Sequence, residues 1–286
     1  MEELQKVGFD MIAEIRTQVA KIPKEERGLI IKEKQGDETS KIDQVAEDAA
    51  FQALERASKR LGIRFHVYSE EQESVKEIGQ GKLKVFTILD PLDGSMNAIS
   101  DIPFYSCIIA FTEPTEKDEV SIGDFKHGFV GDLVHDRVFH SDGKVAMLNT
   151  ERIFCSDETD PMRSRIILDS NTYKYDGAKS REVYESRFMP LRLGFLDYGR
   201  LYGAGLELIT LVAQKGIKPA YTAYLCPFQK LDNIVGPKVI IEAAGGIVTD
   251  WENKPLDDHD MSSRPDVIFS ANKKIHEFIL NRIRSH

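Results

Sequence analysis

The feature that most constrains this chain is an apolar run that ends abruptly in acids. Residues 84–89 (Lys-Val-Phe-Thr-Ile-Leu) are mostly apolar or β-branched and predict a buried strand. Residues 90–95 (Asp-Pro-Leu-Asp-Gly-Ser) follow directly, and residues 96–99 predict a short helix. Acids at a strand end can hold hard cations through oxygen, and the N–H groups at a helix start bind phosphate. This unit therefore indicates metal-assisted phosphoryl chemistry.

The same segment can also be interpreted as a surface turn, because Asp-Pro and Asp-Gly are common turn dipeptides. Two other binding motifs are excluded by spacing. Counted from Asp90, a calcium-binding loop needs oxygen ligands at its third and fifth positions, where Leu92 and Gly94 stand. A P-loop needs a Gly-Lys-Ser or Gly-Lys-Thr segment, and the sequence contains neither.

Two further acidic positions support the chemical interpretation. A predicted strand over residues 64–68 is followed by Ser69, Glu70 and Glu71, and Asp232 opens an apolar helical pattern. Each acid has a plain alternative, since Glu70 and Glu71 suit a solvated loop and Asp is a common helix N-cap. Together with Asp90 they form a set that a structural role alone does not explain.

These motifs, in this order, resemble the inositol monophosphatase family. The resemblance rests on residues 69–71 (Ser-Glu-Glu), residues 90–95, and residues 231–232 (Leu-Asp) with residues 242–246 (Glu-Ala-Ala-Gly-Gly) after them. Further matching segments extend it over almost the whole chain: residues 36–43 (Gly-Asp-Glu-Thr-Ser-Lys-Ile-Asp), residues 200–208 with their Arg-x-x-Gly element, and residues 270–272 (Ser-Ala-Asn). The family fold implied is an α/β (α+β) protein, a layered α-β-α-β-α sandwich of the sugar phosphatase type.

The resemblance implies a metal role for several positions. Asp90 would bridge two ions, with Glu70 and the Leu92 carbonyl completing the first site. Asp93 and Asp232 would complete the second. The expected ions are Mg²⁺, with Mn²⁺ as an alternative, at two to three per site, because oxygen ligands favour these cations.

The resemblance also implies catalytic and substrate contacts. Ser95 and Asp43 would orient the attacking water and take up its proton, and Glu70 would share in catalysis through a third, weaker ion. Gly94 and Ser95 would hold phosphate oxygens through their N–H groups, and Gly203 would also contact the substrate. For Arg200 both a substrate contact and an ion-pairing role remain open, and Glu71 is either a neighbour that orients metal-bound water or a solvated side chain.

The departures from the family pattern bear on the substrate. Inositol-specific members carry an acid shortly before the last ligand aspartate, whereas residues 221–230 contain none here, and Leu231 replaces the usual aromatic residue. The sequence therefore predicts a phosphatase for small phosphate monoesters such as inositol-1-phosphate and fructose-1,6-bisphosphate. The alternatives are a 3′(2′),5′-bisphosphate nucleotidase and a non-catalytic regulatory homologue.

Composition excludes several other classes. The 286 residues, 41% hydrophobic and 30% charged, suit a globular protein, expected as two halves over residues 1–148 and 149–286. A net charge of −9 argues against nucleic-acid binding. Three scattered cysteines and the lack of an apolar run of ~18 residues indicate a cytoplasmic protein without a disulfide framework or membrane span. The resemblance implies that the protein forms a homodimer. It also implies that the molecule it binds is a small phosphate monoester.

Hydrophobic periodicity predicts alternating strands and helices. Besides those above, helices are expected over residues 4–19, 43–60, 178–187, 206–215, 232–244 and 274–283. Strands are expected over residues 106–111, within 127–140, and over 165–169, 191–193, 218–222, 247–249 and 267–270. Residues 24–41, which are charged and contain two glycines, are expected to form a mobile loop.

Overall fold

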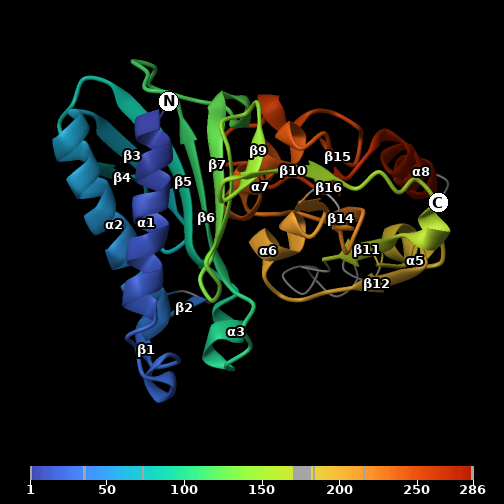
Figure 1. The fold of residues 1–286 in the computed structure, drawn as a ribbon, viewed down its shortest axis with the longest axis horizontal. Helices are drawn as coiled ribbons and strands as arrows, with labels where there is room; N and C mark the ends of the chain where they lie inside the picture. Colours follow the sequence, from blue (N-terminus) through green and yellow to red (C-terminus); the bar gives the residue numbers. More distant parts are fainter. Residues whose placement is uncertain are drawn as a thin grey trace.

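Helices and sheets alternate in five layers across the molecule (Figure 1). The structure is a computed structural model that describes residues 2–34, 37–72, 74–169, 182, 184–214 and 217–284. An outer helix pair covers a large sheet, an inner pair separates it from a smaller sheet, and further helices cover the far side. The predicted α-β-α-β-α sandwich is therefore confirmed.

The first layer consists of α1 (Glu2–Val19) and α2 (Lys41–Leu61), which lie side by side on the large sheet (Figure 1). Each helix buries one face, as an amphipathic pattern requires. In α1 the stripe that includes Leu4, Met11 and Ile15 is buried against the sheet. The helix predicted over residues 4–19 and the one over 43–60 are both present.

Within the described residues, nine strands form the large sheet, in the order β13-β10-β9-β8-β7-β6-β5-β3-β4. The strands are β3 (Arg64–Ser69), β4 (Lys76–Ile78), β5 (Lys84–Asp93), β6 (Ser106–Thr112), β7 (Phe125–Asp132), β8 (Arg137–Ser141), β9 (Ala146–Leu148), β10 (Glu151–Cys155) and β13 (Val212–Gln214). Because β10 and β13 come from the second half of the chain, the expected halves share this sheet, and the division at residue 148 stays a prediction.

The inner layer is formed by α6 (Ala204–Ile209) and α7 (Leu231–Ala243). Helix α7 is apolar around most of its circumference because it is buried between the two sheets. A Cβ on Gly236 would lie only 2.8 Å from the Ile109 carbonyl oxygen, so a glycine is needed for α7 to approach β6 this closely. This close packing fixes the helix that carries Asp232.

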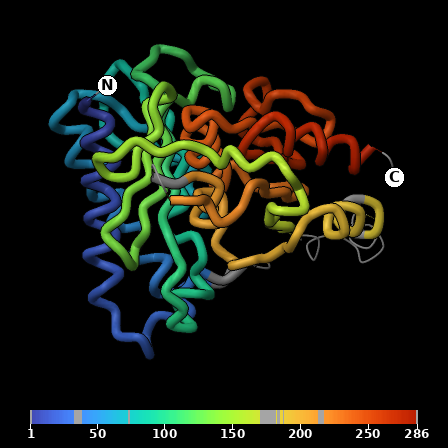
Figure 2. The backbone as a smooth tube through the Cα atoms, turned by 45° about the vertical axis from the view of Figure 1, so that its right-hand side comes forward, coloured from blue at the N-terminus to red at the C-terminus, as the bar shows by residue number. Residues whose placement is uncertain are grey.

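Within the described residues, five strands form the second sheet, in the order β12-β11-β14-β16-β15. They are β11 (Arg165–Leu168), β12 (Asp197–Gly199), β14 (Ala223–Cys226), β15 (Ile247–Asp250) and β16 (Val267–Ser270). Helices α5 (Met189–Arg192) and α8 (Lys273–Arg284) cover its outer face, where a third apolar cluster is buried. Figure 2 shows the N-terminal and C-terminal segments at opposite sides of the molecule.

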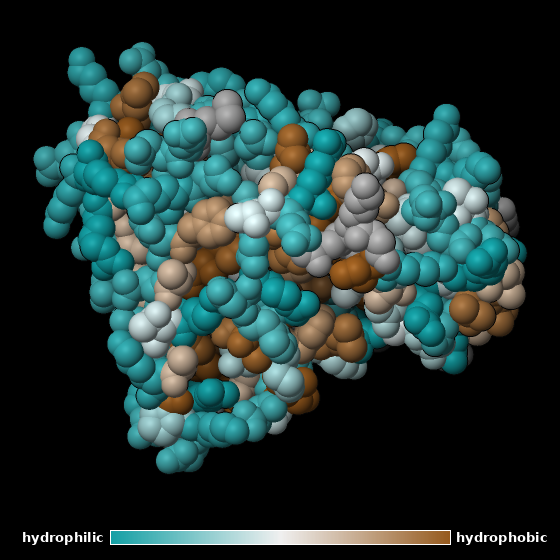
Figure 3. Space-filling view, in the orientation of Figure 1, coloured by the Kyte–Doolittle hydropathy of each residue, from teal (hydrophilic) through white to brown (hydrophobic). Residues whose placement is uncertain are grey.

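The surface is mostly hydrophilic, with hydrophobic side chains visible toward the middle of the face in Figure 3. The remaining elements are short turns and helices: η1 (Lys24–Glu26), α3 (Ser95–Ile99), η2 (Ile122–Asp124), η3 (Pro161–Arg163), the π-helical turn η5 (Tyr184–Phe188) and η6 (Leu256–Asp258). In the described part of the chain, no helix has both the length and the apolar content needed to cross a bilayer.

The prediction of a loop over residues 24–41 was wrong. After η1, the strands β1 (Ile30–Lys34) and β2 (Asp37–Ser40) pair antiparallel, with Ile30 opposite Ser40. The pairing is made by backbone groups, so the charged side chains that suggested a loop do not prevent it. The hairpin leads directly into α2 and so connects to Asp43.

Other errors concern the second half. Residues 191–193 were expected as a strand but form the end and the C-cap of α5, which begins at Met189 and has Pro190 in its first turn, where proline is favoured. The helix expected over residues 206–215 ends at Ile209, because residues 212–214 form β13, which pairs with β10. The strand expected over 218–222 begins only at Ala223, beyond Pro219. Half of the helix expected over 178–187 lies outside the described residues, and residues 184–187 belong to the π-helical turn η5.

Candidate active site

The acidic motif lies at the end of β5, where a bulge sets the direction of its side chains. Asp90 pairs with Ile108 of β6 and Asp93 pairs with Ser106, so β5 holds one extra residue between these pairs. Residues three apart normally point to opposite faces of a sheet, and a bulge changes this alternation. Leu89 and Leu92 accordingly both join the core under α1 and α2. Asp90 and Asp93 both turn to the other side, toward the inner helices.

Asp93 is held by the start of α6. Its Oδ1 accepts the backbone N–H of Ala204 at 2.9 Å, and its Oδ2 accepts both the N–H of Gly205 and the hydroxyl of Ser106, each at 2.9 Å. Burial raises the pKa of Asp93 to about 6, against the opposing effect of these hydrogen bonds. The N-terminus of α6, which carries Gly203 as its N-cap, is thus anchored to the acidic motif.

Asp90 is buried, Asp232 is half-buried, and the charge of Asp232 acts on Asp90. Burial, followed by the charges of Glu70, Asp93 and Asp232, raises the pKa of Asp90 well above its ordinary value. Burial and the charge of Glu70 likewise raise the pKa of Asp232 to about 7. The Oδ1 atom of Asp232 is buried without a hydrogen-bond partner. The charges of Glu70, Asp93 and Asp232 thus act on Asp90, and the assignment of these four carboxylates as metal ligands stays a prediction.

Glu70 follows β3, which runs parallel to β5. The two strands therefore end at the same edge of the sheet, and the Glu70 N–H bonds the Leu89 carbonyl at 3.1 Å. Its carboxylate accepts a hydrogen bond from the ammonium of Lys230, with 2.6 Å between Nζ and Oε1. Sequence reasoning missed Lys230, which is the N-cap residue of α7.

The next group contains Glu71 and Asp43. Glu71 is half-buried and accepts a hydrogen bond from the Thr39 hydroxyl at 2.8 Å. Burial raises its pKa to about 7, with the charges of Asp43 and Glu70 adding to the effect. Asp43 accepts the N–H and the hydroxyl of Ser40 in a capping box that begins α2. Glu71 is therefore no solvated neighbour, and the water-relay role expected of Asp43 stays a prediction.

The short helix α3 is capped by Gly94 and begins with Ser95. Gly94 has a φ of 85°, in the left-handed region that favours glycine. The amide of Asn97, a residue that sequence reasoning missed, donates to the carbonyls of Phe104, Leu201 and Tyr202 at 2.8, 2.9 and 3.2 Å. Asn97 thus fixes α3 against the segment that leads into α6.

Arg200 directly precedes this segment in the chain, and its side chain lies between two buried acids. Its guanidinium forms an ion pair with Asp169 and lies 3.8 Å from Oε2 of Glu207. Glu207 also accepts the N–H groups of Leu201 and Tyr202, and burial raises its pKa to about 7. This is the geometry of the ion-pairing role, and a substrate contact for Arg200 stays a prediction. A strand over residues 165–169 was predicted, but nothing in the local pattern marked Glu207 as a partner of Arg200.

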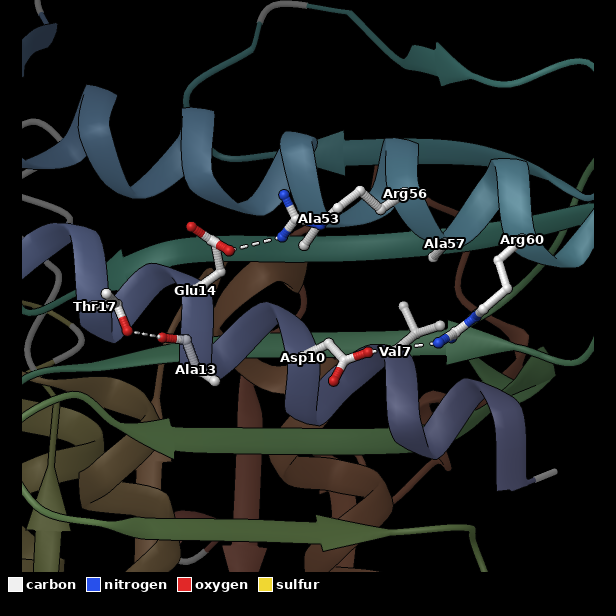
Figure 4. Close-up of a pocket in the computed structure, with 9 residues that line it drawn as sticks. All are labelled: Val7, Asp10, Ala13, Glu14, Thr17, Ala53, Arg56, Ala57 and Arg60. Atoms are coloured by element: carbon white, nitrogen blue, oxygen red, sulfur yellow. Dashed lines mark hydrogen bonds and ion pairs between the residues drawn. The ribbon is translucent and has the colours of Figure 1, made fainter.

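A separate groove of about 390 Å³ lies between α1 and α2 (Figure 4). Its two arginines are engaged, since Arg56 lies 2.7 Å from Glu14 and Arg60 lies 3.7 Å from Asp10. The helices that form it cover the opposite face of the sheet from α6 and α7. This groove therefore lies on the opposite face of the sheet from the contacts of Asp93 with α6.

The carboxylates at the end of β5 have the chemistry of a metal site. Within the described residues, however, no three His, Cys, Asp or Glu side chains are already assembled around a common point. Glu70 is engaged by Lys230, and Asp93 by the start of α6. The candidate donors are thus all oxygens, and two of the four carboxylates, Glu70 and Asp93, are held by other partners.

Comparison with known proteins agrees with the fold and the motifs. The family model "Inositol monophosphatase family" matches residues 1–286. A fructose-1,6-bisphosphatase/inositol-1-monophosphatase of Archaeoglobus fulgidus is 27% identical over 98% of this chain and 97% of its own length. A bifunctional NADP phosphatase/NAD kinase of Methanococcus maripaludis is 29% identical over 85% of this chain, which spans only 42% of that relative.

A solved structure shows the same fold. The extragenic suppressor protein suhB of Bartonella henselae superposes with a TM-score of 0.74, at 20% identity, over 98% of each chain. The layered architecture, the order of the acidic motifs and the match of the family model over the full length lead to one conclusion. This chain belongs to the inositol monophosphatase family.

Proposed function

We propose that this chain is a metal-dependent phosphatase that hydrolyses small phosphate monoesters. The observation that carries the proposal is the set of carboxylates Glu70, Asp90, Asp93 and Asp232, in which burial and the repulsion between like charges raise the pKa of Asp90 and Asp232. Buried like charges are unfavourable unless they are protonated or neutralised by cations. The family, whose named relatives include phosphatases, supports the same activity.

The residues present fit Mg²⁺ or Mn²⁺ in their chemistry. The donor set consists of oxygens, and the buried Oδ1 of Asp232 has no hydrogen-bond partner. Asp90 would bridge two ions, Glu70 and the Leu92 carbonyl would serve the first, and Asp93 and Asp232 the second. When bound, such ions neutralise phosphate charge, acidify a water molecule and stabilise the leaving oxygen.

The chain's own residues would do the positioning. Ser95 and Asp43 would orient the attacking water and accept its proton, and the N–H groups of Gly94 and Ser95 would hold phosphate oxygens. Gly203 is the N-cap residue of α6, the helix whose first N–H groups hold the Asp93 carboxylate. Attack is then in line on phosphorus, without a covalent phospho-enzyme.

We infer a broad specificity that includes inositol-1-phosphate and fructose-1,6-bisphosphate. The segment of residues 221–230 contains no acid that could accept hydrogen bonds from substrate hydroxyls. A site built to read a hydroxyl can discriminate by ~10⁴-fold. Without that group, several sugar or inositol phosphates are expected to be accepted.

A phosphorylated nucleotide is the second candidate substrate. Tyr202 is 68% exposed, and its backbone carbonyl lies beside Gly94, at the end of α3 proposed to hold phosphate. The Arg200 guanidinium lies over the Tyr202 ring at 5.1 Å, and we infer that the exposed ring offers a stacking surface to a base. The NADP phosphatase/NAD kinase relative favours this candidate too, whereas the complete set of carboxylates argues against a regulatory homologue.

The decisive experiment is a phosphate-release screen with Mg²⁺. The substrates are inositol-1-phosphate, fructose-1,6-bisphosphate, glucose-1-phosphate, adenosine 3′,5′-bisphosphate and NADP⁺. Comparable turnover of the sugar and inositol phosphates is expected, and activity should vanish after exhaustive chelation and return with Mg²⁺. Activity that survives chelation contradicts the metal requirement, and a ~10⁴-fold preference for inositol-1-phosphate alone contradicts the broad specificity.

The proposal includes a cytoplasmic location and a homodimer. Cys107, Cys155 and Cys226 form no disulfide in the structure, which suits a reducing compartment. The homodimer follows from the family alone, and analytical ultracentrifugation of the purified chain tests it.

A further inference from the structure

Lys230 occupies a position at the edge of the acidic cluster that the proposed mechanism does not use. Its ammonium bonds Oε1 of Glu70 at 2.6 Å, and both side chains are mostly buried, with 21% and 29% exposed. Lys230 also acts on the next carboxylate, since its charge opposes the burial that raises the pKa of Asp232. An ammonium therefore lies beside two of the carboxylates assigned to divalent ions.

The position of Lys230 contradicts the local preferences of a helix start. It is the N-cap residue of α7, where Ser, Thr, Asp and Asn are preferred because their side chains accept a free N–H. Lysine has no acceptor, and its side chain makes no cap hydrogen bond here. A cation at the positive end of the helix dipole is also unfavourable. The ion pair with Glu70 offsets these costs, and this contact explains why a lysine stands at the N-cap.

The turn before Lys230 is held in place by contacts of its two preceding residues. Phe228 has a φ of 51°, a strained value for a bulky residue, and its N–H donates to Oδ1 of Asp266 at 2.8 Å. The next residue, Gln229, is buried and donates to the Tyr224 hydroxyl at 3.0 Å. The two contacts fix the backbone on the approach to Lys230, which confines its long side chain to the edge of the cluster.

We propose that Lys230 is an internal cation that competes with the divalent ion for Glu70. In the metal-free protein the ammonium neutralises Glu70, which keeps the acidic cluster folded. A divalent ion that takes Glu70 as a ligand must displace this ammonium, so Lys230 weakens metal binding and sets the metal concentration at which the site fills. The inference rests on the proposed metal-dependent function.

Metal binding by the full chain, stripped of metal, tests this inference without reference to activity. The probe is Mn²⁺, with the free ion measured by electron paramagnetic resonance. Lys230→Met removes the charge but keeps much of the apolar stem, and it is expected to bind Mn²⁺ about tenfold more tightly than the wild type, since a nearby positive charge is lost. Lys230→Arg, which keeps the charge, is expected to stay within about threefold of the wild type.

The matched control is Lys254→Met, which makes the same change in net charge at an exposed ion pair with Glu252. It is expected to bind Mn²⁺ as the wild type does. Thermal unfolding gives a second measurement. Metal-free Lys230→Met should melt below the metal-free wild type, because Glu70 and Asp232 are no longer neutralised, and saturating Mn²⁺ should remove the difference.

Three results would overturn the inference. Unchanged or weaker Mn²⁺ binding by Lys230→Met would show that the lysine does not compete, while leaving the proposed function intact. Equal tightening in Lys254→Met would assign the effect to net charge. A wild type that binds no Mn²⁺ would remove the proposed function and this inference with it. If Lys230→Met does not fold, Lys230→Gln replaces it in the same measurements.

Discussion

The carboxylate of Asp93 accepts a hydrogen bond from the backbone N–H of Gly205, 112 residues further along the chain, at 2.9 Å. This bond ties the end of β5 to the start of α6. A carboxylate is favoured there because it pairs with free N–H groups and with the positive end of the helix dipole. Asp93 therefore has a structural role in addition to the metal role proposed for it, and it should respond to mutation differently from Asp90.

Asp90→Asn and Asp93→Asn should have different effects. Asp90→Asn is expected to lower kcat by at least ~10²-fold, because the bridging position is proposed to serve two ions. Asp93→Asn is expected to lower kcat less but to lower the melting temperature more. The carboxylate accepts three hydrogen bonds, and the NH₂ group of asparagine cannot accept the bonds that one of its oxygens accepts. Steady-state kinetics and thermal unfolding of both variants check this. The reverse order in both measurements would contradict it.

Ser95→Ala should lower activity without lowering stability. The helix cap is Gly94 and not Ser95, so the loss of the hydroxyl should not remove a cap. We expect kcat to fall by ~10²-fold with little change in KM, as for a group that acts in the transition state. Ser95→Thr, which restores a hydroxyl, is the control and should keep most activity. Normal turnover by Ser95→Ala would exclude the relay role.

Arg200→Met should destabilise the protein. It would leave Asp169 and Glu207 buried without their cation, a change that costs about 3–5 kcal/mol in comparable buried pairs. Arg163→Met, at an ion pair whose arginine is 70% exposed, is the control and should change stability by less than about 1 kcal/mol. Denaturant unfolding measures both. An Arg200→Met variant of normal stability with a raised KM would instead support a substrate contact.

Glu207 should make stability depend on pH. Burial raises its pKa from an ordinary value of 4.5 to about 7. Between these values the unfolded chain loses the proton while the folded protein keeps it, so stability is lost as pH rises from about 4.5 to about 7. The loss is at most on the order of 3 kcal/mol, from about 1.4 kcal/mol for each pH unit.

Glu207→Gln removes this titration. The melting temperature of the wild type, relative to the variant, is therefore expected to fall between pH 5 and pH 8. Glu55→Gln, at an exposed position of α2, is the control and should leave the pH profile unchanged. A difference between wild type and Glu207→Gln that is constant with pH would show that Glu207 does not titrate in this range.

The local pattern of the sequence was sufficient for the long elements and for the acidic motif. Helix α1 has its apolar stripe at helical spacing, and residues 84–89 of β5 are mostly apolar or β-branched. Both patterns lie within one segment, so the buried elements can be predicted without knowledge of their partners in the fold. The order of Glu70, Asp90, Asp93 and Asp232 likewise identified the family, which the full-length match confirms.

Only the tertiary structure decided which partners these residues have. Strand β13 exists because β10 offers it a pairing edge, although the pattern of residues 206–215 predicts a helix. The bulge that turns Asp90 and Asp93 to one face depends on the register of β5 with β6. The contacts of Asp93 with α6 and of Glu70 with Lys230 join segments more than a hundred residues apart. Periodicity describes the neighbours of a residue along the chain, whereas burial and hydrogen bonding in the folded protein select its neighbours in space.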